Sequence, residues 1–232
     1  MSEYSLTLYG EADMAKIASK FTKKTFDHLP EEKQQLILTT ATEEFAQKGY
    51  EKANINTIAE KAGISVGSLY KYFTSKEDLF LKAVHEGTVF LAKTLEPIIE
   101  SNQSIIDKLS SIIKVIQTTS REHQSLIKLY NEMTSVGNTA LAQRLSQEVE
   151  TISSDAYTRI LQEGQQRGEV RKDIDPRLCS FFMDNLFMSL QFSYVNGYYI
   201  QRFKTYAGED ILEQDEKVAC EMIGFLQAAL LI

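Results

Sequence analysis

Side chains that could read a DNA duplex lie close together in the run SVGSLYKY, residues 65–72. Ser65, Gly67 and Ser68 are short, so a helix beginning here could bring its backbone close to the duplex. Tyr70 and Lys71 carry hydrogen-bond donors that could reach into the major groove and distinguish base edges. An enzyme would instead need a convergent set of titratable groups. The run therefore predicts recognition of DNA.

The residues around this run have the pattern of two short helices joined by a tight turn. The predicted buried face consists of Ile58, Ala62, Ile64, Leu69 and Tyr72. Ala59 is small enough for the second helix to cross closely, and Gly63 can adopt the positive φ that a sharp corner requires. Asn54 and Ser65 precede the two helices as N-caps. Residues 55–73 therefore predict a helix-turn-helix, with an ordinary buried helical hairpin as the alternative.

A second motif overlaps the same turn. Residues 63–67, GISVG, match the G-x-S-x-G pattern of the hydrolase nucleophile elbow. That elbow must join a strand to a helix, whereas here a helix precedes it and the chain offers no convincing strand. His28, His85 and His123 show no metal-ligand spacing. We therefore expect no hydrolase, no metal site and no cofactor.

The longer run GYEKANINTIAEKAGISVGSLYKYFTSKEDLF, residues 49–80, strongly resembles the DNA-binding domain of the tetracycline-repressor (TetR) family of bacterial transcription regulators. Phe45 and the pair Gly49-Tyr50 close the first helix of this pattern, and the run SKE at 75–77 opens the fourth. The resemblance covers residues 30–84. It implies an all-α fold, with an N-terminal three-helix helix-turn-helix DNA-binding domain followed by a C-terminal helical ligand-binding and dimerisation domain.

The resemblance also implies which side chains contact DNA. Those at the recognition helix are Ser65, Val66, Gly67, Ser68, Tyr70 and Lys71. Tyr72, Lys76 and Asn54 would hold phosphates, which sets the register without reading sequence. Val66 stands where the family often has lysine, so one contact is expected to be missing. Tyr72 could also be partly core, and Lys71 could simply be solvated.

Composition and charge limit the other possibilities. The 232 residues are 43% hydrophobic, enough for one substantial core or two modest ones. The net charge of -7 is concentrated after residue 85, because residues 1–85 have 11 lysines against 12 acidic residues. A local field from Lys71 and Lys76 can therefore still favour DNA. The chain shows neither a secretory signal nor an 18-residue apolar run, so we expect a cytoplasmic protein with no membrane partner. Cys179 and Cys220 lie in apolar helical patterns without metal-ligand spacing, so we expect them to be buried free thiols.

Helical periodicity continues through the rest of the chain. Pro30 suits the first turn of a helix, and a capping box at 75–78 opens a long helix toward Pro97 that would link two domains, 30–85 and 86–232. Further helices are expected at about 105–116, 126–133 and 139–166, with a polar break at 118–124. Asp175 and Pro176 should open one continuous helix over 177–203, and a last helix should span about 210–230.

The helix predicted over 177–203 is unusually aromatic and apolar on most sides, so it must be buried on several sides. In a TetR-like fold, one side of it would line an effector pocket and another would join the last helix in a dimer interface. The expected pocket residues are Phe90, Tyr130, Met133, Asp184, Phe187, Met188 and Gln191. Polar groups in this set could orient a ligand, although core packing explains them equally well.

The first 29 residues exceed what the family fold requires. Met14, Ile17 and Phe21 share a helical face, with lysines around it, so this extension is a short basic amphipathic segment. It could be a helix packed on the body, a disordered arm, or an arm that touches DNA phosphates.

These observations together predict a homodimeric, ligand-responsive transcription regulator, most simply a repressor that a partly apolar or aromatic small molecule releases from DNA. Its partner would be double-stranded, near-palindromic operator DNA, with half-sites on the order of 34–36 Å apart or somewhat more. Dimerisation would use the last two helices. A helical protein-interaction module that binds no DNA, or an all-α enzyme, are the alternatives.

Overall fold

The computed structural model describes residues 21–134 and 139–232, without the side chains of 134–149. Within these ranges the chain is helical apart from short connections, and the one strand-type pairing is an isolated bridge between Val170 and Leu231. The all-α prediction is therefore confirmed. No helix in the described part of the chain is both long and apolar enough to span a bilayer.

The chain divides into two compact units, each formed by two stretches of sequence. The first unit comprises Met1–Ala92 and Lys128–Val149, and the second comprises Lys93–Ile127 and Glu150–Ile232. Helix α6, Lys76–Ile99, passes from the first unit into the second, as the prediction of a long linking helix required. The domain limits 30–85 and 86–232 remain a prediction.

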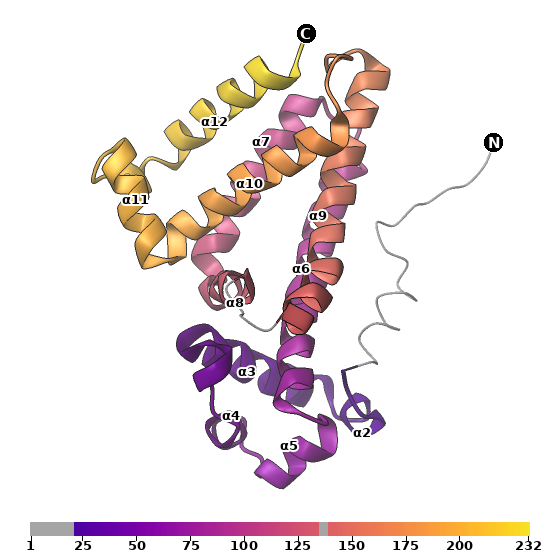
Figure 1. Cartoon of the computed structure of the whole chain (residues 1–232), viewed down its shortest axis with the longest axis vertical. Helices are drawn as coiled ribbons and strands as arrows, with labels where there is room; N and C mark the ends of the chain where they lie inside the picture. The colour runs from indigo at the N-terminus through magenta and orange to yellow at the C-terminus, as the bar shows by residue number, and fades with distance from the viewer. Residues whose placement is uncertain (1–20, 135–138) are drawn as a thin grey trace, which may run out of the picture. The chain divides into compact units, whose positions relative to one another are not determined.

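The first unit is built around four helices near its N-terminal end (Figure 1). They are α2 (Lys24–Asp27), α3 (Glu31–Lys52), α4 (Ile55–Lys61) and α5 (Val66–Tyr72). The beginning of α6 and the end of α8, Gln124–Thr134, complete its core. The largest fully buried side chains of this core are Phe26, Phe45, Phe73, Phe80, Ile37 and Ile58. Leu38 and Ala41 of α3 are buried in the same core.

Helix α3 is interrupted near its C-terminal end by a kink at Gly49. This residue has φ 73° and ψ 161°, a conformation open to glycine but strained for other residues. A Cβ atom there would also lie 2.7 Å from Oε1 of Glu132 on α8, which accepts a 3.1 Å hydrogen bond from the Tyr50 backbone N–H. At its start, α3 differs by one residue from the prediction, because Pro30 is the N-cap rather than a first-turn residue.

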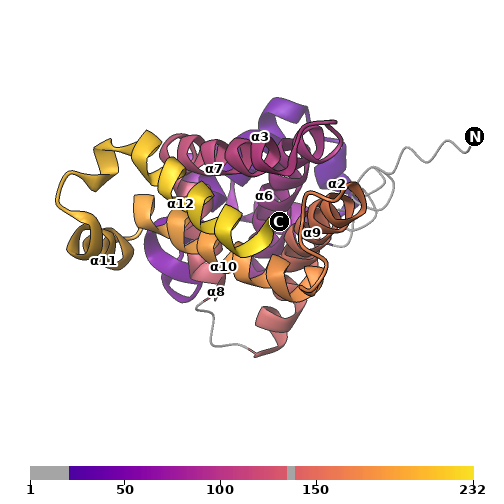
Figure 2. The same cartoon turned by 90° about the horizontal axis from the view of Figure 1, so that it is seen from above.

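Four helices and a short 3₁₀ turn make up most of the second unit (Figures 1 and 2). They are α7 (Ile105–Glu122), α10 (Pro176–Val195), α11 (Gly197–Ala207), α12 (Asp215–Leu230) and the turn η1 (Ile211–Glu213). Both α10 and α12 pack against α7. Cys179 on α10 and Cys220 on α12 are free thiols, but the first is half-buried and the second exposed, so the prediction that they are buried is wrong. Helix α9, Thr139–Arg167, contributes its residues from Glu150 onward.

Three predicted helix limits in the second unit were wrong. The helix expected over 177–203 is interrupted at Asn196, whose extended backbone ends α10 and whose side chain accepts the Tyr198 N–H to cap α11. The polar break expected at 118–124 shrinks to His123, because α7 continues to Glu122. The last helix starts at Asp215, after a separate 3₁₀ turn. In the first and third cases a local cap or turn outweighed the apolar periodicity. In the second, α7 continued through polar residues, of which Gln117 and Ser120 are buried.

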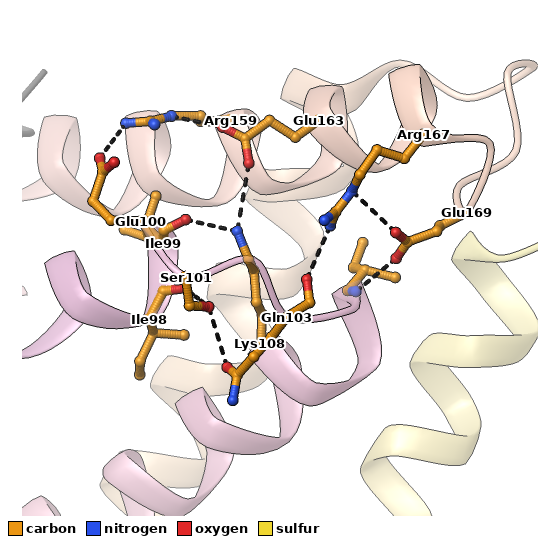
Figure 3. Close-up of polar contacts among 11 residues, drawn as sticks. Ile98, Ile99, Glu100, Ser101, Gln103, Lys108, Arg159, Glu163, Arg167 and Glu169 are labelled. Atoms are coloured by element: carbon orange, nitrogen blue, oxygen red, sulfur yellow. Dashed lines mark hydrogen bonds and ion pairs between the residues drawn. The ribbon is translucent and has the colours of Figure 1, made fainter. Parts of the chain in front are cut away.

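A polar network joins α6, α7 and α9 where the chain turns between the first two (Figure 3). The side chain of Lys108 is only 1% exposed, and its Nζ donates to the carbonyl of Ile99 at 2.6 Å and lies 3.4 Å from Glu163. Arg159 bonds both Glu163, at 2.9 Å, and Glu100, at 2.7 Å. The Ile99 carbonyl, at the end of α6, has no partner within the helix, and Lys108 supplies its hydrogen-bond donor.

Candidate nucleic-acid interface

Helix α4 and the turn that follows it have the geometry of a helix-turn-helix corner. Asn54 Oδ1 accepts the Asn56 N–H at 2.9 Å, which confirms the predicted N-cap of α4. Gly63 has φ 63°, and its N–H donates to the Glu60 carbonyl at 3.0 Å. The predicted glycine turn is therefore present, and Ile58, Ala59 and Ala62 are buried around it.

Helix α5 begins at a second cap and turns one face inward. Ser65 Oγ accepts the Ser68 N–H at 3.0 Å, as the sequence predicted. Its hydroxyl also pairs with that of Ser68 at 2.8 Å. Leu69 is buried, whereas Ile64 and Tyr72, which were predicted to be equally buried, are only partly so and pack against the rim of the core.

The opposite face of α5 is open and polar. Tyr70 is 47% exposed, and Lys71, Ser65 and Gly67 are exposed as well. Val66 and Ser68 are half-buried beside them. The fold thus presents on one face of a two-turn helix most of the residues expected to read DNA. Their contacts with DNA remain predictions.

Lys76, the first residue of α6, follows the helix-turn-helix, whereas Asn54 caps its first helix. Lys76 Nζ donates to the carbonyl of Glu51 at 3.0 Å and lies 5.1 Å from the centre of the Tyr50 ring. An ammonium has three donors, so this arrangement still leaves capacity for a phosphate oxygen. Burial, followed by the acidic side chains Glu77, Glu51 and Asp78, raises the pKa of Tyr50.

Sequence reasoning missed one set of contacts to α5. Residues 1–20 of the predicted extension lie outside the described residues. Its last part, 21–29, packs on the first unit, with Phe21 and Phe26 buried. Lys23 and Thr25 bond carbonyls of α5. The sequence pattern placed Phe21 on an apolar helical face, but nothing in the sequence indicated that this segment contacts α5.

The residues predicted for an effector pocket are divided between the two units. Phe90, Tyr130 and Met133 belong to the first, where Met133 is part of the core and Tyr130 packs against it. The other four, Asp184, Phe187, Met188 and Gln191, lie on α10 in the second unit. Phe187 is buried there, and its ring centre lies 5.3 Å from that of Tyr157 in an edge-to-face contact. The pocket itself remains a prediction.

Asp184 is the most unusual of these side chains, because it is a largely buried carboxyl group. It hydrogen-bonds Ser153 of α9, and Glu150 lies near enough to repel its negative charge. Desolvation, assisted by Glu150 and opposed by the Ser153 hydrogen bond, raises the pKa of Asp184 to about 6. Burial likewise raises the pKa of Tyr157. The second unit therefore contains a carboxyl group that holds its proton to a higher pH than a solvated carboxyl does.

An all-α chain with a capped two-helix corner and an open, polar second helix is a protein of the helix-turn-helix DNA-binding class. Residues 37–83 match the family profile "Bacterial regulatory proteins, tetR family". The matched residues include the helix-turn-helix, so this part of the chain is similar to the DNA-binding domain of the TetR family of transcription regulators.

Individual relatives agree with this similarity. The transcriptional regulator YhgD of Bacillus subtilis is 27% identical over 167 residues, covering 70% of this chain and 84% of its own. The fatty acid metabolism regulator protein of the same organism is 28% identical over 144 residues, which span 62% of this chain and 73% of that protein. The crystal structure of FadR from Bacillus subtilis in complex with stearoyl-CoA has a TM-score of 0.65 at 22% identity, covering 80% and 96% of the two chains.

Proposed function

We propose that the protein is a homodimeric transcriptional repressor, whose subunits place α5 in successive major grooves of a near-palindromic operator and leave it when a small effector binds. The observation that carries this proposal is the exposed face of α5, with Tyr70 and Lys71 held on a helix that Ser65 caps and Leu69 anchors. A population shift between two conformations would couple the effector to DNA, and it requires unequal binding of the effector to them.

Selection of bound sequences from random DNA, followed by gel-shift titration, tests the DNA-binding part. Tyr70→Ala and Lys71→Ala should each weaken binding to the selected operator by about five- to 150-fold, since a base contact is worth about 1–3 kcal/mol. Matched controls in the second unit are Tyr206→Ala and Lys114→Ala, because both side chains are exposed there. Equal affinities for the two pairs of variants would contradict the assignment of α5 as the reading helix.

Exposed apolar side chains on α10 and α12 support the homodimer. Leu178, Phe181 and Phe182 follow one face of α10 and are 53%, 61% and 55% exposed, and Phe225 of α12 is 63% exposed. Side chains of this size on one surface favour association, and a two-fold axis lets the same surface serve both subunits. A second copy of this chain is the partner that the family resemblance implies.

Sedimentation velocity with a matched pair of variants tests this interface. Leu178→Lys should shift the protein toward monomers, because it places a charge on the apolar surface. Leu36→Lys introduces the same charge on α3, where Leu36 is 45% exposed, and should leave the mass unchanged. A dimer that survives Leu178→Lys as well as it survives Leu36→Lys would exclude the proposed surface.

A partly apolar effector is favoured by the aromatic α10 and by the stearoyl-CoA held in the FadR complex from Bacillus subtilis. Long-chain acyl-CoAs and apolar phenols are therefore suitable first probes. An effector should lower operator affinity in the gel shift and raise the thermal midpoint of the free protein. A compound that raises the midpoint without changing operator affinity would bind without acting as an effector.

A further inference from the structure

The C-terminal end of α5 is completed by a distant part of the chain. The last carbonyls of any helix lack partners within it. In α5, the carbonyl of Leu69 accepts from Phe73 at 3.0 Å, and the carbonyls of Tyr70, Lys71 and Tyr72 follow it. The next residues are Phe-Thr-Ser, so the common closure through a left-handed glycine is not available.

Two residues before the helix-turn-helix supply donors to all three of these carbonyls. The backbone N–H of Lys23 donates to Tyr72 at 2.8 Å, and its Nζ donates to Tyr70 at 2.8 Å. The hydroxyl of Thr25 donates to Lys71. The two side-chain bonds span 47 and 46 residues of sequence. The ammonium of Lys23 also lies at the negative end of the α5 dipole, where a cation is favoured.

Apolar contacts fix the same segment to the core. Phe26 is 1% exposed, and its ring centre lies 4.9 Å from Phe73 and 6.0 Å from Tyr72. Phe21 is 2% exposed and lies 6.3 Å from the His85 ring of α6. The donors on Lys23 and Thr25 are therefore held between two buried aromatic anchors.

We propose that residues 21–27 form a brace for the recognition helix, in which Lys23 and Thr25 are positioning residues for operator recognition. Helix α5 has only seven residues, and a helix this short is not stable through its own hydrogen bonds. Tyr70 and Lys71, the side chains expected to enter the groove, lie at the braced end. The inference rests on the proposed DNA-reading function of α5.

The brace differs from a direct phosphate contact in its response to salt. Removal of a lysine that contacts phosphate lowers the dependence of log affinity on log salt by about one. Removal of a brace leaves every phosphate contact available, so affinity should fall by the same factor at each salt concentration. A neighbouring lysine without a bond to α5 distinguishes the two roles, and exposed Lys24 provides it.

The test compares Lys23→Met and Thr25→Val with the controls Lys24→Met and Thr25→Ser in the full-length protein. Binding to the operator selected by the wild-type protein is measured at several salt concentrations, and hydrogen exchange follows the amides of residues 69–73. Lys23→Met and Thr25→Val should weaken binding about two- to tenfold, the range of one hydrogen bond, with an unchanged salt slope. Exchange should accelerate in α5 and stay unchanged in α7. Thr25→Ser, which keeps the hydroxyl, should have the operator affinity and the exchange rates of the wild-type protein.

Three results would overturn the brace. Wild-type affinity and exchange in both Lys23→Met and Thr25→Val would do so. A reduced salt slope in Lys23→Met would also do so, because it would make Lys23 a phosphate contact. If the wild-type protein selects no DNA, the proposed function fails and the positioning role fails with it. Operator binding by the wild-type protein thus distinguishes the failure of the brace alone from the failure of both.

Discussion

Replacement of Asp184 by asparagine should stabilise the protein at neutral pH and have much less effect in acid. Burial raises the pKa of this carboxyl from 3.8 to about 6 in the folded state. The native protein therefore holds the proton more tightly than the unfolded chain does. The resulting stabilisation is complete below the unfolded pKa of 3.8 and is lost as the pH rises through about 6. Above that pH, folding must bury an ionised carboxylate.

The size of the effect follows from the difference between the two pKa values. At 1.36 kcal/mol per pKa unit, a carboxyl whose pKa moves from 3.8 to about 6 costs about 3 kcal/mol when fully ionised. At pH 4.5 the same linkage gives a destabilisation of only about 1 kcal/mol, because the carboxyl is then still protonated in the folded protein. Asparagine carries no charge at either pH. The difference in unfolding free energy between Asp184→Asn and the wild type should therefore grow by about 2 kcal/mol in favour of the variant as the pH rises from 4.5 to 7.5.

Urea unfolding followed by circular dichroism at 222 nm measures this difference. Protein concentration must be fixed, because the stability of a dimer depends on it. Asp155→Asn is the control, since Asp155 is an exposed carboxylate on α9 in the same unit. If the stability difference between Asp184→Asn and wild type is the same at pH 4.5 and 7.5, the carboxyl is not desolvated in the folded state and the reasoning is refuted.

Three further predictions concern stability. Gly63→Ala should lower the free energy of unfolding by about 1–2 kcal/mol through backbone strain alone, because φ is positive and the nearest atom to an added Cβ is 3.9 Å away. Gly67 lies within helix α5, so an equal loss in Gly67→Ala would contradict this explanation. Lys108→Met should cost about 1–3 kcal/mol in urea unfolding, since the Ile99 carbonyl loses its donor while Glu163 keeps Arg159; an unchanged midpoint would show that the bond contributes nothing. Arg121→Lys should lower the thermal midpoint by a few degrees, because lysine cannot reproduce the two bonds to Asp215 at 2.7 and 3.2 Å; an identical midpoint would rule out a contribution from the fork.

The sequence alone determined the features of the helix-turn-helix that depend on near neighbours. Asn54 and Ser65 cap helices through N–H groups two and three residues ahead, and Gly63 supplies a positive φ within a single residue. Such interactions leave a signature in residue type and spacing, because both partners lie in one short window. The same holds for Asp175, which caps α10 as predicted.

The tertiary structure alone decided which distant groups meet. Lys23 and Tyr70 are 47 residues apart, and Lys108 and Glu163 are 55 apart, so no local pattern records either pair. A lysine in a sequence looks equally suited to solvent, and the path of the chain determines whether its stem is buried and which carbonyl it reaches. The raised pKa of Asp184 arises in the same way, because desolvation depends on every element packed around the carboxyl group. The sequence thus determined the helix proposed to read DNA, while the folded chain decided how that helix is held.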